Sequence, residues 1–195
     1  VEFESMRIGK IFEAIVFQHA ELSNWFGENA ITIQASEFDD IANGVDTIVE
    51  FTDDAMPHHL ALAIDVTTSA NIRDKFNKIK EKIDSGRLTK IRYFVSENLG
   101  FKGEKTNVPH VVIGADRKTI RNIVDLWTSN DMKGLAEHPV QIKILQEIKL
   151  QLESFQEYCN KAGREGLADI YNRGIATINR ILEEKSPDEQ QISEL

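Results

Sequence analysis

Cysteine is nearly absent from this chain of 195 residues, and long apolar runs are lacking. A single cysteine, Cys159, cannot form an internal disulfide, which is typical of a protein from a reducing compartment. The longest apolar runs have the length of a strand, so no segment of about 20 residues is predicted to cross a bilayer. The first residues contain neither a basic leader nor an apolar signal region. We therefore expect a cytoplasmic protein with no membrane partner.

Basic residues are outnumbered by acids, 23 to 32, which argues against a generally basic nucleic-acid binder. Residues 73–92 reverse this balance, with eight basic residues against three acids, whereas residues 1–60 are strongly acidic. We predict nucleic-acid contact in the basic run. The alternative is a solvated helix face. The residues proposed for this contact are Arg73, Lys78, Lys82, Lys90 and Arg92.

Hydrophobic periodicity predicts an α/β (α+β) protein with one substantial core. The expected helices cover residues 4–22, the segment from 69 to Gly86, residues 116–129, and two long helices between 135 and 185. The expected strands cover residues 31–34, 44–51, 60–67, 89–96 and 108–115, and residues 36–44 are expected to be an irregular connection. This divides the chain into an α/β domain (1–134), a helical hairpin (135–185) and a frayed tail (186–195). The hairpin could pack on the core, form a homodimer or hold a partner.

Two of these strands each carry acids on one face. Alternation places Asp65 and Thr67 on the face of the small residues Ala61 and Ala63, which leaves room for a helix or a substrate. Asp46 and Glu50 share a face of the preceding strand, so the four polar side chains could converge. A buried carboxylate needs a compensating partner, and two of them together suggest a metal ion.

The order of helix, strand, strand with Asp, strand with Asp-x-Thr, helix and strand over residues 4–96 resembles the αβββαβ core of the PD-(D/E)XK, restriction-endonuclease-like nucleases. The motifs that carry the resemblance are Gly9-x-x-x-Glu13, Gly44-Val45-Asp46 and Ile64-Asp65-Val66-Thr67. It implies a central mixed sheet flanked by helices and a nuclease that uses Mg²⁺ or Mn²⁺, with DNA as its substrate. By the same resemblance, Asp46, Asp65 and the Val66 carbonyl would hold the metal, and Glu13 would orient the site or a second ion.

One position departs from the family pattern. The family's lysine stands two residues after the second acid, where this chain has Thr67. Some members resemble this sequence in having moved the lysine to the following helix, where Lys75 and Lys78 lie. Lys75 is closer to the apolar stripe of that helix, so we expect it to point inward. A lysine there could orient the attacking water or stabilise charge that develops on the phosphate.

Two other interpretations compete with a nuclease. Asp65, Thr67 and Ser69 match the Asp-x-Ser/Thr-x-Ser spacing of adhesion-type metal sites, as in von Willebrand type A domains. That fold would place the motif on its first strand, whereas here a helix and a hairpin precede it. The second alternative is a nuclease-like scaffold without catalytic activity that binds DNA or protein. The missing lysine at position 67 favours it, and the two retained acids argue against it.

Overall fold

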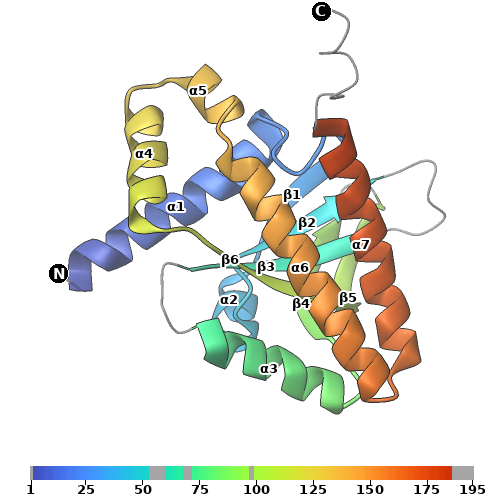
Figure 1. Cartoon of the computed structure of the whole chain (residues 1–195). Coiled ribbons are helices and arrows are strands. Elements are labelled where there is room, and N and C mark those ends of the chain that lie inside the picture. Colours follow the sequence, from blue (N-terminus) through green and yellow to red (C-terminus); the bar gives the residue numbers. More distant parts are fainter. Residues whose placement is uncertain (1, 53–59, 68–71, 97–98, 186–195) are drawn as a thin grey trace, which may run out of the picture.

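The computed structural model describes residues 2–52, 60–67, 72–96 and 99–185, with side chains from residue 9 onward. Helices and strands are interspersed up to β6, after which the described residues, up to 185, form helices and their connections (Figure 1). The helices are α1 Glu2–Leu22, α2 Glu37–Asn43, α3 Ile72–Asp84, α4 Arg117–Thr128, α5 Met132–Ala136, α6 Val140–Lys161 and α7 Glu165–Lys185. The strands are β1 Ala30–Gln34, β2 Thr47–Phe51, β3 Leu60–Thr67, β4 Thr89–Ser96, β5 Phe101–Val108 and β6 His110–Gly114.

The central sheet is mixed. Its four strands lie in the order β1-β2-β3-β6, and the β1–β2 and β2–β3 pairs are antiparallel. Strand β6 pairs with β3 in parallel, with Asp65 opposite Val112. A parallel neighbour requires a crossover, and α3 together with the β4–β5 ribbon lies within that crossover. The sheet is thus flanked by helices, as the sequence predicts.

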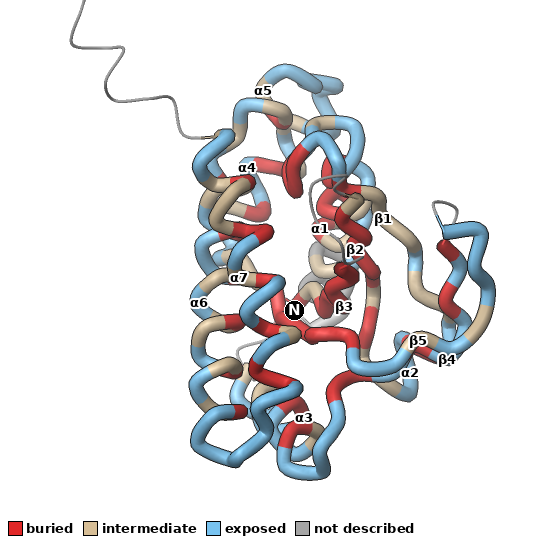
Figure 2. Tube along the Cα trace, turned by 90° about the vertical axis from the view of Figure 1, so that its right-hand side faces the viewer, coloured by how far each residue is buried: buried red, intermediate tan, exposed pale blue. Residues whose placement is uncertain are grey.

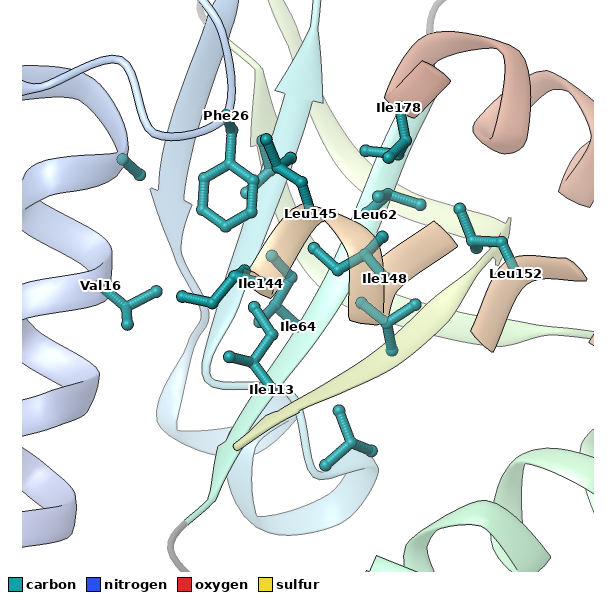
Figure 3. Packing of buried hydrophobic residues seen from close by; sticks show 14 of the residues in the cluster. Val16, Phe26, Leu62, Ile64, Ile113, Ile144, Leu145, Ile148, Leu152 and Ile178 are labelled. Carbon is teal, nitrogen blue, oxygen red and sulfur yellow. The ribbon is translucent and has the colours of Figure 1, made fainter. Parts of the chain in front are cut away.

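One face of the sheet packs against helices. The even-numbered apolar residues of β3 point to this face, where they meet residues of α1, α6, α7 and β6 in one hydrophobic cluster. Figure 3 shows these side chains interdigitating, with Leu62 and Ile64 of β3 facing Ile148 of α6. The buried stretches of α6 and α7 face the sheet (Figure 2). The helical pair therefore belongs to the same core as the sheet.

The other face of the sheet carries a smaller cluster. Ala61 and Ala63 of β3 pack there with Ile91 and Phe94 of β4 and Val108 of β5. The ribbon of β4 and β5 forms a separate two-stranded sheet and stands on this side of the molecule (Figure 2). The space beside the alanines, predicted to admit a helix or a substrate, is thus occupied by this ribbon. Asp65 lies on the same face, just beyond the alanines.

The strongest sequence patterns are confirmed. Strands β3 and β4 have the predicted bounds, and Asp116 caps α4 through hydrogen bonds from the N–H groups of Lys118 and Thr119. The predicted apolar stripes of α6 and α7 are buried except for Ile170, which is half-buried: Ile144, Leu145, Ile148, Leu152 and Phe155 in α6, and Leu167, Tyr171, Ile178 and Ile181 in α7. No helix of the described residues is long and apolar enough to span a membrane.

The expected irregular connection at residues 36–44 is wrong, because this segment contains α2. Ser36 is its N-cap and accepts a hydrogen bond from the N–H of Asp39, and Gly44 ends the helix in the left-handed conformation (φ 67°). The acids of the first turn favour a helix N-terminus, since they interact well with its dipole. The Asp and Asn residues that indicated a loop are therefore the caps and first turn of a short helix. Strand β2 then begins at Thr47, and Asp46 directly precedes it.

The strands after α3 also differ from the expectation. Residues 101–108 form β5, which the sequence analysis did not predict because most of its residues are exposed and lack an alternating pattern. Strand β4 pairs with β5 and does not join the central sheet. The strand that was predicted to complete the αβββαβ order by residue 96 therefore lies outside the central sheet, whose fourth strand is β6, ending at residue 114.

Candidate functional site

The position of α2 is fixed by a buried aspartate. The carboxylate of Asp39 is fully buried and accepts hydrogen bonds from the backbone N–H groups of Arg92 (2.9 Å) and Tyr93 (3.1 Å) on β4. Ser36 Oγ (2.7 Å) and Asn43 Nδ2 (2.9 Å) also donate to it. Such charge-assisted bonds are stronger than neutral ones, so α2 is held firmly against the β4–β5 ribbon. Because α2 is held in place and ends shortly before Asp46, the position of Asp46 is fixed as well.

Asp46 is tied to the end of β3. Its backbone N–H donates to the carbonyl of Ile64 (2.9 Å), and its Oδ2 accepts from the N–H of Val66 (2.7 Å). Val66 directly follows Asp65, so the two predicted acids belong to adjacent strand ends. The second acid lies against a lysine, because Lys75 Nζ is 2.5 Å from Asp65 Oδ1 and 2.7 Å from Oδ2. Elements β2, β3 and α3 thus bring Asp46, Asp65 and Lys75 into one neighbourhood.

The side chains of this neighbourhood face two hollows on either side of α2. The basic cleft, of about 410 Å³, is lined by Asp65, Lys75, Lys78, Glu81, Lys82, Arg87, His110 and the C-terminal end of α2. The acidic hollow, of about 640 Å³, is lined by Lys10, Glu13, Gln34, Asp40, Asp46 and apolar residues of α1. The predicted acids are thus divided: Asp65 faces the basic cleft, and Glu13 and Asp46 face the acidic hollow.

Burial and repulsion between acids raise the pKa values of Glu13, Asp46 and Asp65. Burial, together with the charges of Glu13, Asp65 and Asp40, raises the pKa of Asp46 to about 7, against the hydrogen bond from Val66. Burial also raises the pKa of Asp65, although Lys75 counteracts it. The pKa of Glu13 is raised by burial and by Asp40. At neutral pH, Asp46 is therefore divided between its neutral and its charged form.

The predicted basic residues are placed in different surroundings. Lys78 and Lys82 line the basic cleft, whereas Arg73 lines neither hollow. Lys90 pairs with Glu104 of β5 (2.6 Å). The guanidinium of Arg92 lies over the exposed ring of Phe38, 5.6 Å from its centroid. The basic run thus supplies two of its five predicted contact residues to the cleft.

Two further polar residues of the predicted set lie away from the acids' meeting point. Glu50 is fully buried and interacts electrostatically with Lys105 of β5. Thr67 lines a third hollow together with Gly114 and Gln151. The expected convergence of Asp46, Glu50, Asp65 and Thr67 is therefore limited to Asp46 and Asp65. Ser69, the third residue of the adhesion-type pattern, lies outside the described residues.

Several residues of the site were not singled out from the sequence. Asp40 acts on the pKa values of all three predicted acids, and the capping residues around α2 were the signal that could have revealed it. Arg87, Thr89 and His110 contribute to the basic cleft or its floor. Thr89 and His110 are almost fully buried at the starts of β4 and β6. No local pattern brings these two strand starts together, because β4 and β6 belong to different sheets.

Within the described residues, no group of three or more Asp, Glu, His or Cys side chains is arranged to hold one metal ion. Two of the predicted acids already accept hydrogen bonds: Lys75 donates to both carboxylate oxygens of Asp65, and the N–H of Val66 donates to one oxygen of Asp46. Each oxygen of an ionised carboxylate has a second lone pair, so the bonds to Lys75 leave Asp65 able to contact a cation as well. Comparisons with protein-family models, curated proteins and solved structures find no match to this chain.

Proposed function

We propose that this protein is a metal-dependent nuclease that hydrolyses phosphodiester bonds in nucleic acid. The observation that carries the proposal is the meeting of Asp46, Asp65 and Lys75 from three elements, with Lys75 on both oxygens of Asp65. The order of α1, β1, β2, β3, α3 and β6 around a mixed sheet supports it, since it matches the αβββαβ order of the restriction-endonuclease-like fold when α2 and the β4–β5 ribbon are taken as insertions. DNA is favoured over RNA by that resemblance alone.

The acids have the chemistry of a site for Mg²⁺ or Mn²⁺. Carboxylate oxygens are the donors that these ions prefer, and the raised pKa values of Glu13, Asp46 and Asp65 mean that a nearby cation would be favourable. Asp46, Asp65 and the Val66 carbonyl would hold the ion, with Glu13 on the side of α1. A bound divalent ion supplies charge stabilisation at the phosphoryl oxygens and lowers the pKa of its water.

The chain's own residues supply the remaining functions. Lys75 lies at the boundary between Asp65 and the basic cleft, where its ammonium can contact a phosphate oxygen or orient a water molecule. Its side chain is 31% exposed and that of Asp65 is 9% exposed, so a ligand in the cleft can reach the lysine. Lys78, on the same wall, adds positive charge one turn further along α3. In this proposal, Lys75 stabilises charge that develops on the phosphate, and Lys78 positions the nucleic-acid backbone.

The proposal is tested by a cleavage assay with plasmid and single-stranded DNA in Mg²⁺ or Mn²⁺. We expect cleavage by the wild type and a loss of at least about 100-fold in Asp65→Asn, as for other groups that stabilise the transition state. Lys80→Ala is the matched control for Lys75→Ala, because Lys80 is on the same helix but lies over the ring of Tyr158. Wild-type rates in Asp65→Asn would contradict the proposal.

A second candidate function is a nuclease-like scaffold that binds DNA or protein without cleavage. The ion pair between Lys75 and Asp65 favours it, because the pair already neutralises one of the acids. The scaffold predicts that neither Mg²⁺ nor Mn²⁺ changes DNA binding, whereas the nuclease predicts that both do. A homodimer through α6 and α7 stays a prediction, and the apolar stripes of these helices lie in the core of the single chain.

A further inference from the structure

The basic cleft is lined by more cationic side chains than carboxylates. Lys75 is paired with Asp65, but Lys78, Lys82 and Arg87 have no ion pair within the parts of the chain that the structure describes. They share the cleft with a single further acid, Glu81. Burial lowers the pKa of Lys82, and the charges of Arg87 and Lys78 lower it further. The cleft thus concentrates positive charge in a partly buried position, and a bound anion would reduce the repulsion between these cations.

The floor of the cleft holds Lys82 in place. Its Nζ donates to Thr89 Oγ1 (3.0 Å), and Thr89 Oγ1 lies 3.2 Å from His110 Nδ1. Burial, with the charges of Lys82 and Lys75, lowers the pKa of His110 to about 3, so its ring is neutral. Because the Thr89 oxygen accepts from Lys82, its hydroxyl proton can be donated to Nδ1 of His110. This chain of bonds uses one of the three N–H groups of Lys82 and leaves the others for a ligand.

The size and charge of the cleft suit a phosphate group. At about 410 Å³ it has room for a phosphate and its sugar, within the range of small-ligand pockets. A phosphate offers three or four acceptor oxygens in several directions, and Lys78 and Lys82 of α3 and Arg87 of the turn after α3 can donate to it. A carboxylate offers only two oxygens in one plane. Phosphate is therefore the anion that uses most of the donors.

We propose that the basic cleft is a phosphate subsite, formed by Lys78, Lys82 and Arg87, that takes a phosphate of the nucleic-acid strand other than the one that is cleaved. The nucleic-acid origin of the phosphate rests on the proposed nuclease function, whereas phosphate binding itself does not. The cleft opens beside Lys75 and Asp65, so a phosphate held there positions the strand next to the acids. The source is either a terminal phosphate or an internal phosphate of the strand.

The first measurement is calorimetric titration of the full chain with inorganic phosphate at low salt. We expect binding by the wild type and a loss of affinity of about tenfold in Arg87→Gln and in Lys78→Gln, because each removes a charged donor. Lys80→Gln makes the same charge change on the opposite side of α3 and should bind like the wild type. Arg87 and Lys78 are exposed, so these variants should fold normally, and equal melting temperatures check this. Binding that is absent, or equally strong in Arg87→Gln and Lys78→Gln, overturns the subsite.

The second measurement identifies the source of the phosphate. Short oligonucleotides with a 5′-phosphate, a 3′-phosphate or hydroxyl ends are titrated in Ca²⁺. A terminal phosphate predicts that Arg87→Gln weakens only the oligonucleotide with the matching end, and an internal phosphate predicts that it weakens all three. If Arg87→Gln weakens none of them, the nucleic-acid assignment of the subsite fails. Phosphate binding without cleavage in Mg²⁺ would contradict the nuclease and leave the phosphate subsite standing.

Discussion

The two hollows beside α2 have opposite electrostatics although each contains one of the two motif acids. In the basic cleft, Asp65 is paired with Lys75 and surrounded by further cations. In the acidic hollow, the charged groups that act on the pKa of Asp46 are all acids, and burial with this repulsion raises it to about 7. The difference shows that the two strand ends are not equivalent. One side of α2 favours binding of an anion, and the other favours binding of a cation or a proton.

This difference accounts for the chemistry that we propose. Phosphodiester hydrolysis requires positive charge at the phosphate and a polarised water, and we propose that the two hollows supply these on either side of α2. Glu13 and Asp46 supply negative charge from α1 and from the start of β2, and Lys75 supplies positive charge from α3. Helix α2 separates the two sets of side chains. The substitutions proposed below therefore change Lys75, the helix that separates the hollows, Asp46 of the acidic hollow, or two lysines of the basic cleft.

Lys75→Ala should have the largest effect. It removes the cation next to Asp65 and should lower the cleavage rate by about 100-fold or more, because the lysine acts on charge that develops in the transition state. It should also tighten Mn²⁺ binding, since Asp65 then lacks its partner. Cleavage rates and Mn²⁺ titrations of this variant and of the control Lys80→Ala provide the measurement. If activity is lost in Lys78→Ala and kept in Lys75→Ala, Lys78 is the catalytic lysine instead of Lys75.

Asp39→Ala should destabilise the wall between the hollows. The substitution leaves the N–H groups of Arg92 and Tyr93 without their acceptor and removes the link from α2 to β4. We expect a loss of about 2–3 kcal/mol in the free energy of unfolding, since the lost bonds are buried and charge-assisted. Urea denaturation measures it, with the exposed Glu37→Ala in the same helix as the control. A loss no greater than that of the control would show that α2 is held by other contacts.

Asp46→Asn should stabilise the metal-free protein at alkaline pH. Because the folded-state pKa of Asp46 is raised to about 7, its contribution to stability is fully present below the unfolded value and is lost as the pH rises through about 7. The amide keeps an oxygen acceptor for the N–H of Val66 and removes the titration. After allowance for solvent screening, we expect a gain of about 1–2 kcal/mol at about pH 8 and little change at about pH 4.

Denaturation of Asp46→Asn at several pH values tests this expectation. The control is Asp125→Asn, which changes an exposed acid of α4. A stability curve with the same pH dependence in the wild type and in Asp46→Asn would mean that Asp46 is not the group that titrates.

Charge reversal in the basic cleft should have the smallest effect. Phosphate contacts release counterions, so the affinity for DNA in Ca²⁺ should fall with salt. Lys78→Glu together with Lys82→Glu should reduce the slope of log affinity against log salt by about 1–2 units, and Lys80→Glu should change it less. Fluorescence anisotropy over a range of salt concentrations measures the slope. An unchanged slope would mean that these lysines do not contact DNA and that the basic run is a solvated helix face.

Strand alternation and helix periodicity predicted the central pieces of this arrangement. They placed Asp65 on the face of Ala61 and Ala63, and they favoured Lys75 over Lys78 as the inward-pointing lysine. Both patterns are local, with periods of two and about 3.6 residues, so one sequence suffices to read them. Whether the acids bind a metal is a matter of function that these periods do not address.

The division into two hollows could not be predicted in this way. It depends on α2, whose Asp and Asn residues resemble those of a loop, and on Asp39, whose partners are more than 50 residues away in sequence. It also depends on the β4–β5 ribbon, which packs on the alanine face through Ile91 and Phe94. Strand β5 has a mostly exposed surface and no clear alternation, so its pairing with the neighbouring strand β4 left no signal in the hydrophobic pattern.

The most direct test of the account is calorimetric titration of the wild type with Mn²⁺ at about pH 6 and about pH 8, in buffers of different ionisation enthalpy. The account predicts one ion per chain, tighter binding at the higher pH, and proton release at the lower pH, because Asp46 must lose its proton to bind the ion. Asp46→Asn should abolish the proton release and weaken binding, and Asp65→Asn should weaken binding at both pH values. Mn²⁺ binding that is absent, or that persists unchanged in Asp46→Asn and Asp65→Asn, would contradict it.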